Sequence, residues 1–441
     1  MKKRIDTYLV NRNTWNKSQS PPKMALSNQE VFALRREYSI SDTNNADRLW
    51  AILKDISKDA LYNESDCILY CESDVIFSEA FSGELFEGII KKGKTLNAEL
   101  VIFGACWLLN AFPAGENLFW VDKCDDLHFA IFYKPLLAKI YKTSTYQGNN
   151  VYYFLSELTS RKFIAHPYIT KPKENLHICS HLNISSKQDI HDLYLKSSQR
   201  LQYISEIYHH FSESNATIDK KSDAIIPEIQ IPVYVMNLPE RTERKSHIIN
   251  EFSKREEFEL NFIEACRHEI GALGHWLSIR KIVEAAVTKE EDVIIICEDD
   301  HIFTPEYKKE YLIKNIVEAY LSNTDFLLGG VSKADMITPI SENRYWVRFF
   351  LSTQFVIVYK RFFDKILNEP FDEKIVADVR LSCMSNNKAV LYPFISTQKD
   401  FGYSDITAIH NSEKDLVSSM FQESELAFSR VHSAAQLYSL K

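Results

Sequence analysis

Short apolar runs alternate along the chain with longer segments of helical periodicity. The runs at 5–11 and 129–133 are typical of strands buried on both faces, and Val293–Cys297 is a third run of this kind. Apolar residues at helical spacing predict helices over 47–61 and 190–211. Strands that alternate with helices indicate an α/β fold, in which helices flank a mainly parallel sheet.

The same pattern occurs twice in the chain, with a constant offset. Glu298 lies 226 residues after Glu72, inside two similar segments. The register holds over roughly 160 positions, and its matched pairs include Ile5/Ile231, Trp50/Trp276, Gly104/Gly330 and Pro167/Pro393. A period of this length is the size of a domain. We therefore predict two tandem copies of one domain, at 1–211 and 229–441, joined by a polar linker at 212–228.

Composition narrows the classes of function. The 441 residues suffice for two globular domains with cores of their own. The net charge of −8 argues against a nucleic-acid partner, and the eight cysteines lack the paired spacing of a zinc site. We see no apolar segment of a secretory signal and no run long enough to span a bilayer. We expect a cytoplasmic protein, and a peripheral association with the inner membrane face stays open.

Three acidic residues, Glu298, Asp299 and Asp300, end the buried run of the second copy. Self-repulsion and desolvation make this arrangement costly unless a cation neutralises the carboxylates. A solvated acidic turn is the alternative, but the Glu-x-Asp pattern recurs at Glu72 and Asp74 of the first copy. The sequence therefore predicts a divalent-cation site with Asp300 as its ligand.

Four short stretches of the second copy occur in an informative order. They are VYVMNLPERTER at 233–244, GALGHWLS at 271–278, the acidic strand end ICEDDHIF, and QKDFGYSDI at 398–406. In this combination nearly all of the second copy resembles the glycosyltransferase family 25 proteins, which are sugar transferases of the lipopolysaccharide type. The resemblance implies a GT-A, Rossmann-like fold in each copy, a UDP-hexose donor, Mn²⁺ or Mg²⁺ as cofactor, and inversion of the anomeric centre.

The family motifs and the residue chemistry together give a set of donor-binding candidates. Guanidinium groups suit bidentate phosphate contacts, and glycines at a helix start allow close approach of backbone to the donor. Glu298 and Asp299 are candidates for holding the ribose or a metal-bound water. The predicted donor-binding residues are Asn237, Arg241, Arg244, Gly271, Gly274, Ser278, Glu298, Asp299 and Asp405.

Each of these assignments has a structural alternative. The two arginines can be solvated loop residues, and the glycines can serve a tight turn and helix packing. His275 and Trp276 are interpreted as packing residues or cavity wall. The first copy repeats the tryptophan as Trp50 but has Leu49 in place of the histidine.

An inverting transfer needs a base that takes the proton of the acceptor hydroxyl. Asp378 matches the place where the family carries an aspartate, with Asp372 and Glu373 behind it. An exposed helical acid is the alternative for Asp378. Either Asp405 or His410 is expected to close the donor or metal site, with His410 as a second metal ligand.

The first copy departs from this pattern. It reads RNTWNKS where the second copy reads LPERTER, and Tyr152 stands at the position of Asp378. We expect it to keep the fold and to have lost or changed part of the donor site. It is then either a second transferase of different specificity or a non-catalytic module for the acceptor or for dimerisation.

The sequence thus predicts a transferase that moves a hexose, galactose or glucose, from a UDP-sugar to a glycan or lipid-linked glycan acceptor. The expected process is synthesis of a surface polysaccharide or lipopolysaccharide, with the second copy catalytic. Two active domains and a non-catalytic glycan-binding protein are the alternatives. A hydrolase with two opposed carboxylates is disfavoured because the acids cluster at one strand end. The oligomeric state is not predicted.

Overall fold

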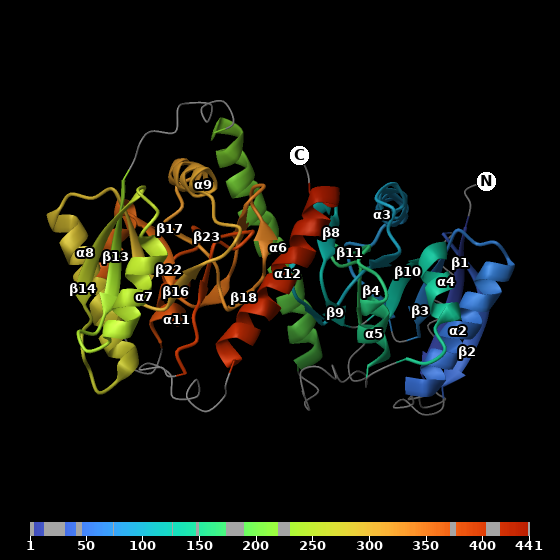
Figure 1. The fold of residues 1–441 in the computed structure, drawn as a ribbon. Coiled ribbons are helices and arrows are strands. Elements are labelled where there is room, and N and C mark those ends of the chain that lie inside the picture. Colours follow the sequence, from blue (N-terminus) through green and yellow to red (C-terminus); the bar gives the residue numbers. More distant parts are fainter. Residues whose placement is uncertain are drawn as a thin grey trace. The chain divides into compact units, whose positions relative to one another are not determined.

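A computed structural model describes residues 4–12, 31–40, 46–73, 75–125, 127–146, 150–172, 189–218, 230–370, 376–402 and 415–439. The chain forms two compact units (Figure 1). Unit 1 comprises Met1–Glu206 with Ala434–Lys441, and unit 2 comprises Ile207–Ser433. Helix α6 (Asp189–Ile218) extends into the segment expected as a linker, and the domain boundaries stay a prediction.

Unit 2 is built on an eight-stranded sheet of order β14-β13-β15-β22-β17-β23-β20-β19. Strands β20 and β22 run opposite to the others, so the sheet is mixed around a parallel majority. The strand bounds are β13 Ile231–Asn237, β14 Phe258–Glu264, β15 Val293–Glu298, β17 Phe326–Leu328, β19 Thr338–Pro339, β20 Arg344–Trp346, β22 Phe355–Tyr359 and β23 Lys388–Leu391.

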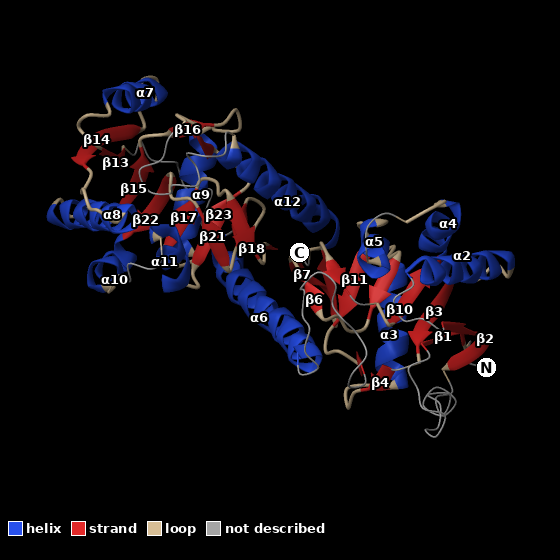
Figure 2. Cartoon of the chain, turned by 90° about the horizontal axis from the view of Figure 1, so that it is seen from below, coloured by secondary structure: helices blue, strands red, loops and turns tan. Residues whose placement is uncertain are grey.

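Two short strand pairs and a set of helices complete unit 2. The pairs are β16 (His301–Phe303) with β24 (Ser396–Gln398), and β18 (Lys333–Asp335) with β21 (Phe349–Leu351). The helices are α7 Thr242–Phe252, α8 Gly271–Thr288, α9 Lys309–Leu321, η1 Lys360–Phe362, α10 Phe363–Asn368, α11 Ala377–Met384 and α12 Leu416–Tyr438. Helix α7 lies on one face of the sheet, and α8, α10 and α11 lie on the other (Figure 2).

Unit 1 has an eight-stranded sheet of matching order, β2-β1-β3-β10-β5-β11-β8-β7. Its strands are β1 Ile5–Arg12, β2 Phe32–Ile40, β3 Cys67–Glu72, β5 Leu100–Ile102, β7 Ala111–Gly115, β8 Leu118–Val121, β10 Phe129–Tyr133 and β11 Lys162–Ala165. Strand β4 (Val75–Phe77) pairs with β12 (Thr170–Pro172), and β6 (Trp107–Leu108) pairs with β9 (Cys124–Asp125). The helices besides α6 are α2 Ala46–Tyr62, α3 Gly83–Thr95, α4 Lys134–Lys142 and α5 Val151–Glu157.

The two units therefore repeat one fold in the register that the sequence predicts. Strands β3, β10, β11 and β12 coincide end to end with β15, β22, β23 and β24 after a shift of 226 residues. Core hydrogen bonds recur as well: the indole N–H of Trp120 donates to the Ser160 carbonyl, and that of Trp346 donates to the Asn386 carbonyl. The prediction of two tandem Rossmann-like α/β units is confirmed. None of the described helices is long and apolar enough to cross a membrane.

The order of the strands in unit 2 creates a switch point between β13 and β15. From β13 the chain passes through α7 to the edge strand β14, whereas from β15 it passes through α9 toward β17 on the other side. Both strands present their carboxyl ends at the same edge, because they pair in parallel. In open α/β sheets, ligands bind in the crevice at such a point. The acidic strand end lies there.

A buried lysine joins β23 to the end of α11. Lys388 donates from Nζ to the carbonyls of Ser382 at 2.7 Å and Ser385 at 2.5 Å, and burial lowers its pKa to about 8. Lys162 of unit 1 does the same with the carbonyls of Ser156 and Thr159, and burial lowers its pKa as well. Each lysine ties the helix before its strand to the sheet.

We expect Lys388→Met to lower the free energy of unfolding by ~1–3 kcal/mol, because two buried carbonyls lose their donor. Chemical denaturation of the full chain measures the change. The exposed Lys254, replaced by Met, is the matched control and is expected to leave stability unchanged. Equal stability of both variants would show that the carbonyls find other partners.

Candidate functional site

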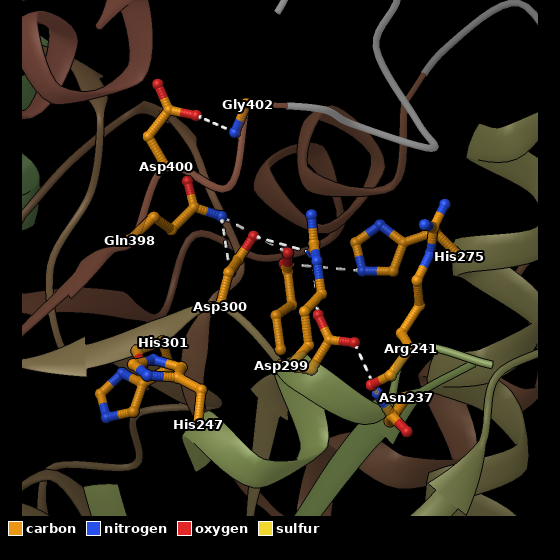
Figure 3. Close-up of polar contacts among 12 residues, drawn as sticks. Asn237, Arg241, His247, His275, Asp299, Asp300, His301, Gln398, Asp400 and Gly402 are labelled. Atoms are coloured by element: carbon orange, nitrogen blue, oxygen red, sulfur yellow. Dashed lines mark hydrogen bonds and ion pairs between the residues drawn. The ribbon is translucent and has the colours of Figure 1, made fainter. Parts of the chain in front are cut away.

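A cavity of about 500 Å³ opens in unit 2 at the carboxyl ends of β13 and β15. Every predicted site residue that the structure describes lines this cavity. These residues are Asn237, Arg241, Arg244, Gly271, Gly274, Ser278, Glu298, Asp299, Asp300 and Asp378. Figure 3 shows several of these side chains and their polar contacts. The other predicted residues, Asp372, Glu373, Asp405 and His410, lie outside the described residues.

Asp299 is neutralised by protein groups. Its carboxylate accepts a hydrogen bond from Asn237 Nδ2 at 2.9 Å (Figure 3) and another from Arg244 Nη1 at 2.9 Å. Arg244 Nη1 also lies 3.5 Å from Asp300 Oδ2, and the Arg244 side chain is only 10% exposed. Arg244 is therefore not a solvated loop residue, and it links the first turn of α7 to the acidic end of β15.

Glu298 and Asp300 are less well compensated. Glu298 accepts a hydrogen bond from Thr353 Oγ1 at 2.6 Å, and Gln398 Nε2 lies 3.4 Å from an oxygen of each carboxyl group. Burial, with the charges of Asp378 and Asp299, raises the pKa of Glu298 to about 7, although the Thr353 bond opposes the shift. Burial, with the charges of Glu298 and Asp299, raises the pKa of Asp300 well above its usual range. Two half-buried carboxyl groups thus face the cavity, and the Gln398 amide lies 3.4 Å from an oxygen of each.

Gly274 and Ser278 have a packing role in α8. A Cβ on Gly274 would lie 2.7 Å from the Cys266 carbonyl oxygen, so only glycine allows the helix to approach that loop. Ser278 Oγ donates to the Gly274 carbonyl at 2.7 Å and accepts from the Cys266 N–H at 2.8 Å. Both residues hold the loop after β14 against α8, where it forms part of the cavity wall.

Asp378 lies in the first turn of α11 and is half-buried rather than exposed. Its carboxylate accepts from the backbone N–H of Ser352 at 3.0 Å and of Val379 at 2.9 Å. Ser352 has a φ of 88°, a left-handed conformation that is costly for a residue with a side chain. These contacts fix the orientation of the Asp378 carboxylate at the cavity.

Sequence reasoning missed several residues that line the cavity. Gln398 belongs to β24 and reaches the acidic strand end because β24 pairs with β16, where it stands opposite His301. Phe401 follows it, with the guanidinium of Arg244 and the ammonium of Lys399 each 4.8 Å from its ring centre. Thr353 precedes β22, the neighbour of β15. Only long-range strand pairing reveals these positions.

The structure offers a partial fit to a divalent cation. Among the described residues, no group of three or more His, Cys, Asp or Glu side chains has an arrangement that could hold a metal ion. Asp299 is engaged by Arg244, which leaves Glu298 and Asp300 as hard oxygen donors. Magnesium sites often use one or two carboxylates and take their remaining ligands from substrate phosphates. The residues present fit that kind of site.

The corresponding place in unit 1 has different chemistry. Glu72, the counterpart of Glu298, is buried and accepts hydrogen bonds from the hydroxyl groups of Tyr70, at 2.8 Å, and of Tyr152. Tyr152 is the counterpart of Asp378, so a phenol stands where unit 2 has a carboxylate. Ser73 donates to Asn11 Oδ1 at 3.1 Å, in the positions of Asp299 and Asn237. Among the described residues, unit 1 therefore keeps hydrogen bonds at the strand end but has a serine and a phenol in place of two of the carboxylates.

Comparisons with known proteins give little beyond this. No protein-family model matches the chain, and no curated protein matches it. Among solved structures, A197 from STIV has 13% identity and a TM-score of 0.28, covering 39% of this chain and 86% of its own. Apo-UDP-glucose pyrophosphorylase has 10% identity and a TM-score of 0.26, covering 50% and 86%. A nucleoside-diphosphate-sugar pyrophosphorylase from Vibrio cholerae RC9 has 11% identity and a TM-score of 0.23, covering 47% and 87%. Similarities this distant carry no argument about function.

The raised pKa of Glu298 leads to a pH-dependent stability. Between its ordinary pKa of 4.5 and its folded value of about 7, the folded state holds a proton that the unfolded state has lost. The free energy of unfolding therefore falls as pH rises through this window. Glu298→Gln removes the penalty, and we expect it to stabilise the protein by ~1–3 kcal/mol at pH 8 and hardly at pH 4.

Chemical denaturation at both pH values measures this difference. Glu284→Gln, an exposed position on α8, is the matched control. A stabilisation of equal size at both pH values would contradict the explanation by charge burial.

Proposed function

We propose that unit 2 is a glycosyltransferase that moves a hexose, galactose or glucose, from a UDP-sugar to a glycan or lipid-linked glycan acceptor, with inversion. The proposed role is synthesis of a surface polysaccharide or lipopolysaccharide. The observation that supports it is the shared cavity at the switch point of the sheet, which motif residues from four separate stretches line together. Carboxylates, arginines and a backbone-anchored aspartate meet there.

The cationic side chains of the cavity suit the diphosphate of the donor. Arg241 and Arg244 lie at the start of α7, and Lys399 follows β24. Guanidinium groups bind phosphate oxygens through paired N–H donors. Arg244 is already ordered by Asp299, so little side-chain entropy is lost when a phosphate binds beside it.

Asp300 is the proposed ligand of Mn²⁺ or Mg²⁺, and Glu298 is proposed to hold a water on the ion or a hydroxyl of the donor. When bound, the ion would neutralise the charge that develops on the departing diphosphate. The raised pKa values of both carboxyl groups support this assignment, because a cation between them would relieve their burial and repulsion. Asp405 and His410 stay predictions for a further contact.

Asp378 is the proposed base for the acceptor hydroxyl. Two backbone N–H groups hold its carboxylate in one orientation, which a positioned proton acceptor requires. In unit 1 the phenol of Tyr152 takes this place and cannot serve as a base near neutral pH. This difference favours unit 2 as the catalytic unit over two active domains.

We expect the full chain to bind UDP in the presence of Mn²⁺, and Asp300→Asn to weaken that binding by ~10–100-fold. The estimate follows from the loss of one charged contact of ~1.5–3 kcal/mol. Calorimetric titration measures both affinities. Asp292→Asn, at the exposed opposite end of β15, is the control and is expected to bind UDP normally. If the unmodified protein does not bind UDP with Mn²⁺, the nucleotide-sugar proposal fails.

We expect Asp378→Asn to lower kcat by ~10²–10⁴-fold, since the amide cannot accept the acceptor proton. Affinity for UDP should stay within about twofold, because the proposed base does not touch the nucleotide. The measurement is transfer from UDP-galactose and UDP-glucose to a panel of glycan acceptors. Asp364→Asn, an exposed residue of α10, is the control. Full turnover in Asp378→Asn would exclude this residue as the base.

A further inference from the structure

His275 is a buried polar residue without a partner at the cavity. It is the fifth residue of α8, and its side chain is 10% exposed. Its Nε2 has no hydrogen-bond partner among the described residues, and the nearest acidic oxygen, Glu298 Oε1, is 3.7 Å away (Figure 3). That separation exceeds the 2.7–3.2 Å of a hydrogen bond.

An unsatisfied buried nitrogen of this kind destabilises the folded protein unless a ligand bonds to it. Packing alone does not require a histidine at this position. Its counterpart in unit 1, Leu49, is also buried and has no polar group. An imidazole nitrogen can donate a hydrogen bond to a hydroxyl group or accept one from it. His275 lines the cavity, and its Nε2 points toward the carboxyl group of Glu298, which lines the cavity as well.

The cavity carries charges of both signs. Asp299 and Asp300 are accompanied by Arg244, whose guanidinium contacts both carboxylates. The carboxyls of Glu298 and Asp378 lie near His275, and Arg241 lines the cavity as well. A diphosphate is attracted to the guanidinium groups and repelled by the carboxyls of Glu298 and Asp378. Sugar hydroxyls, in contrast, can donate to carboxylates and bond to an imidazole.

We propose that His275 hydrogen-bonds a hydroxyl of the hexose carried by the UDP-sugar, beside Glu298 and Asp378, and thereby sets the preference for the sugar. This inference rests on the proposed function and deepens it by assigning the sugar end of the donor site. Unit 1 supports it by contrast: Leu49 stands in place of His275 and Tyr152 in place of Asp378, so the imidazole and the carboxylate are replaced together.

The test compares UDP with UDP-galactose and UDP-glucose, titrated with Mn²⁺ into the full chain and into His275→Leu. The leucine variant copies the residue of unit 1. We expect its affinity for UDP to stay within about twofold, and the ratio of its affinities for the two UDP-sugars to change by on the order of 10-fold. Thermal unfolding checks that the variant is folded.

Two further variants make the outcome specific. His275→Gln keeps a hydrogen-bonding side chain and is expected to restore part of the preference between the two sugars. His209→Leu, at an exposed position of α6, controls for the substitution itself.

An unchanged sugar preference in folded His275→Leu would overturn the assignment. An equal loss of affinity for UDP and for both UDP-sugars would also overturn it, because His275 would then act on the nucleotide or on the shape of the site. A failure of the proposed function is distinguished by the unmodified protein, which would then bind no UDP at all.

Discussion

The ion pair between Arg244 and Asp299 is the interaction on which the site of unit 2 depends. A buried strand that ends in three consecutive acids concentrates negative charge where water is scarce, and each charge needs its own compensation. Asp299 obtains it from Arg244 and from Asn237, so that β13, α7 and β15 are joined at one point. Glu298 and Asp300 have only neutral donors and partial contact with Arg244, and their pKa values rise instead. The fold thus compensates the charges of the three acids unequally, and it leaves Glu298 and Asp300 available to a ligand.

Much of the fold can be predicted from the sequence, because its strands and its duplication follow from local patterns of apolar residues. The apolar runs define the strands, and the constant offset between Glu72 and Glu298 reveals the duplication. The predicted residues come together because they follow strands whose carboxyl ends share an edge. Gln398 and Thr353 could not be foreseen, since their positions depend on the pairing of β24 with β16 and of β22 with β15. Ser278 stays predicted as a donor contact, and the structure adds that its hydroxyl bonds to Gly274 and Cys266.

The two units show that the fold and the site are separable. The features that both units retain lie in the core: a tryptophan bonded to a carbonyl, a lysine buried under a helix end, and the same order of strands. The features that differ lie at the carboxyl ends of the strands, where Tyr152 and Leu49 replace Asp378 and His275. Tyr152 also donates to Glu72, so unit 1 satisfies inside the protein a carboxylate whose counterpart in unit 2 faces a cavity.

The identical order of strands in both units has a consequence for folding. While the chain is still unfolded, a strand such as β3 can enter the sheet of the other copy, since its counterpart β15 has the same length and corresponding neighbours. Divergence between the copies opposes this exchange. A β3 strand in the sheet of unit 2 would bring Tyr70 to the place of Ile296, beneath a site without Tyr152 to accompany it. The sequence differences that separate the chemistry of the two units therefore also help each strand to find its own sheet.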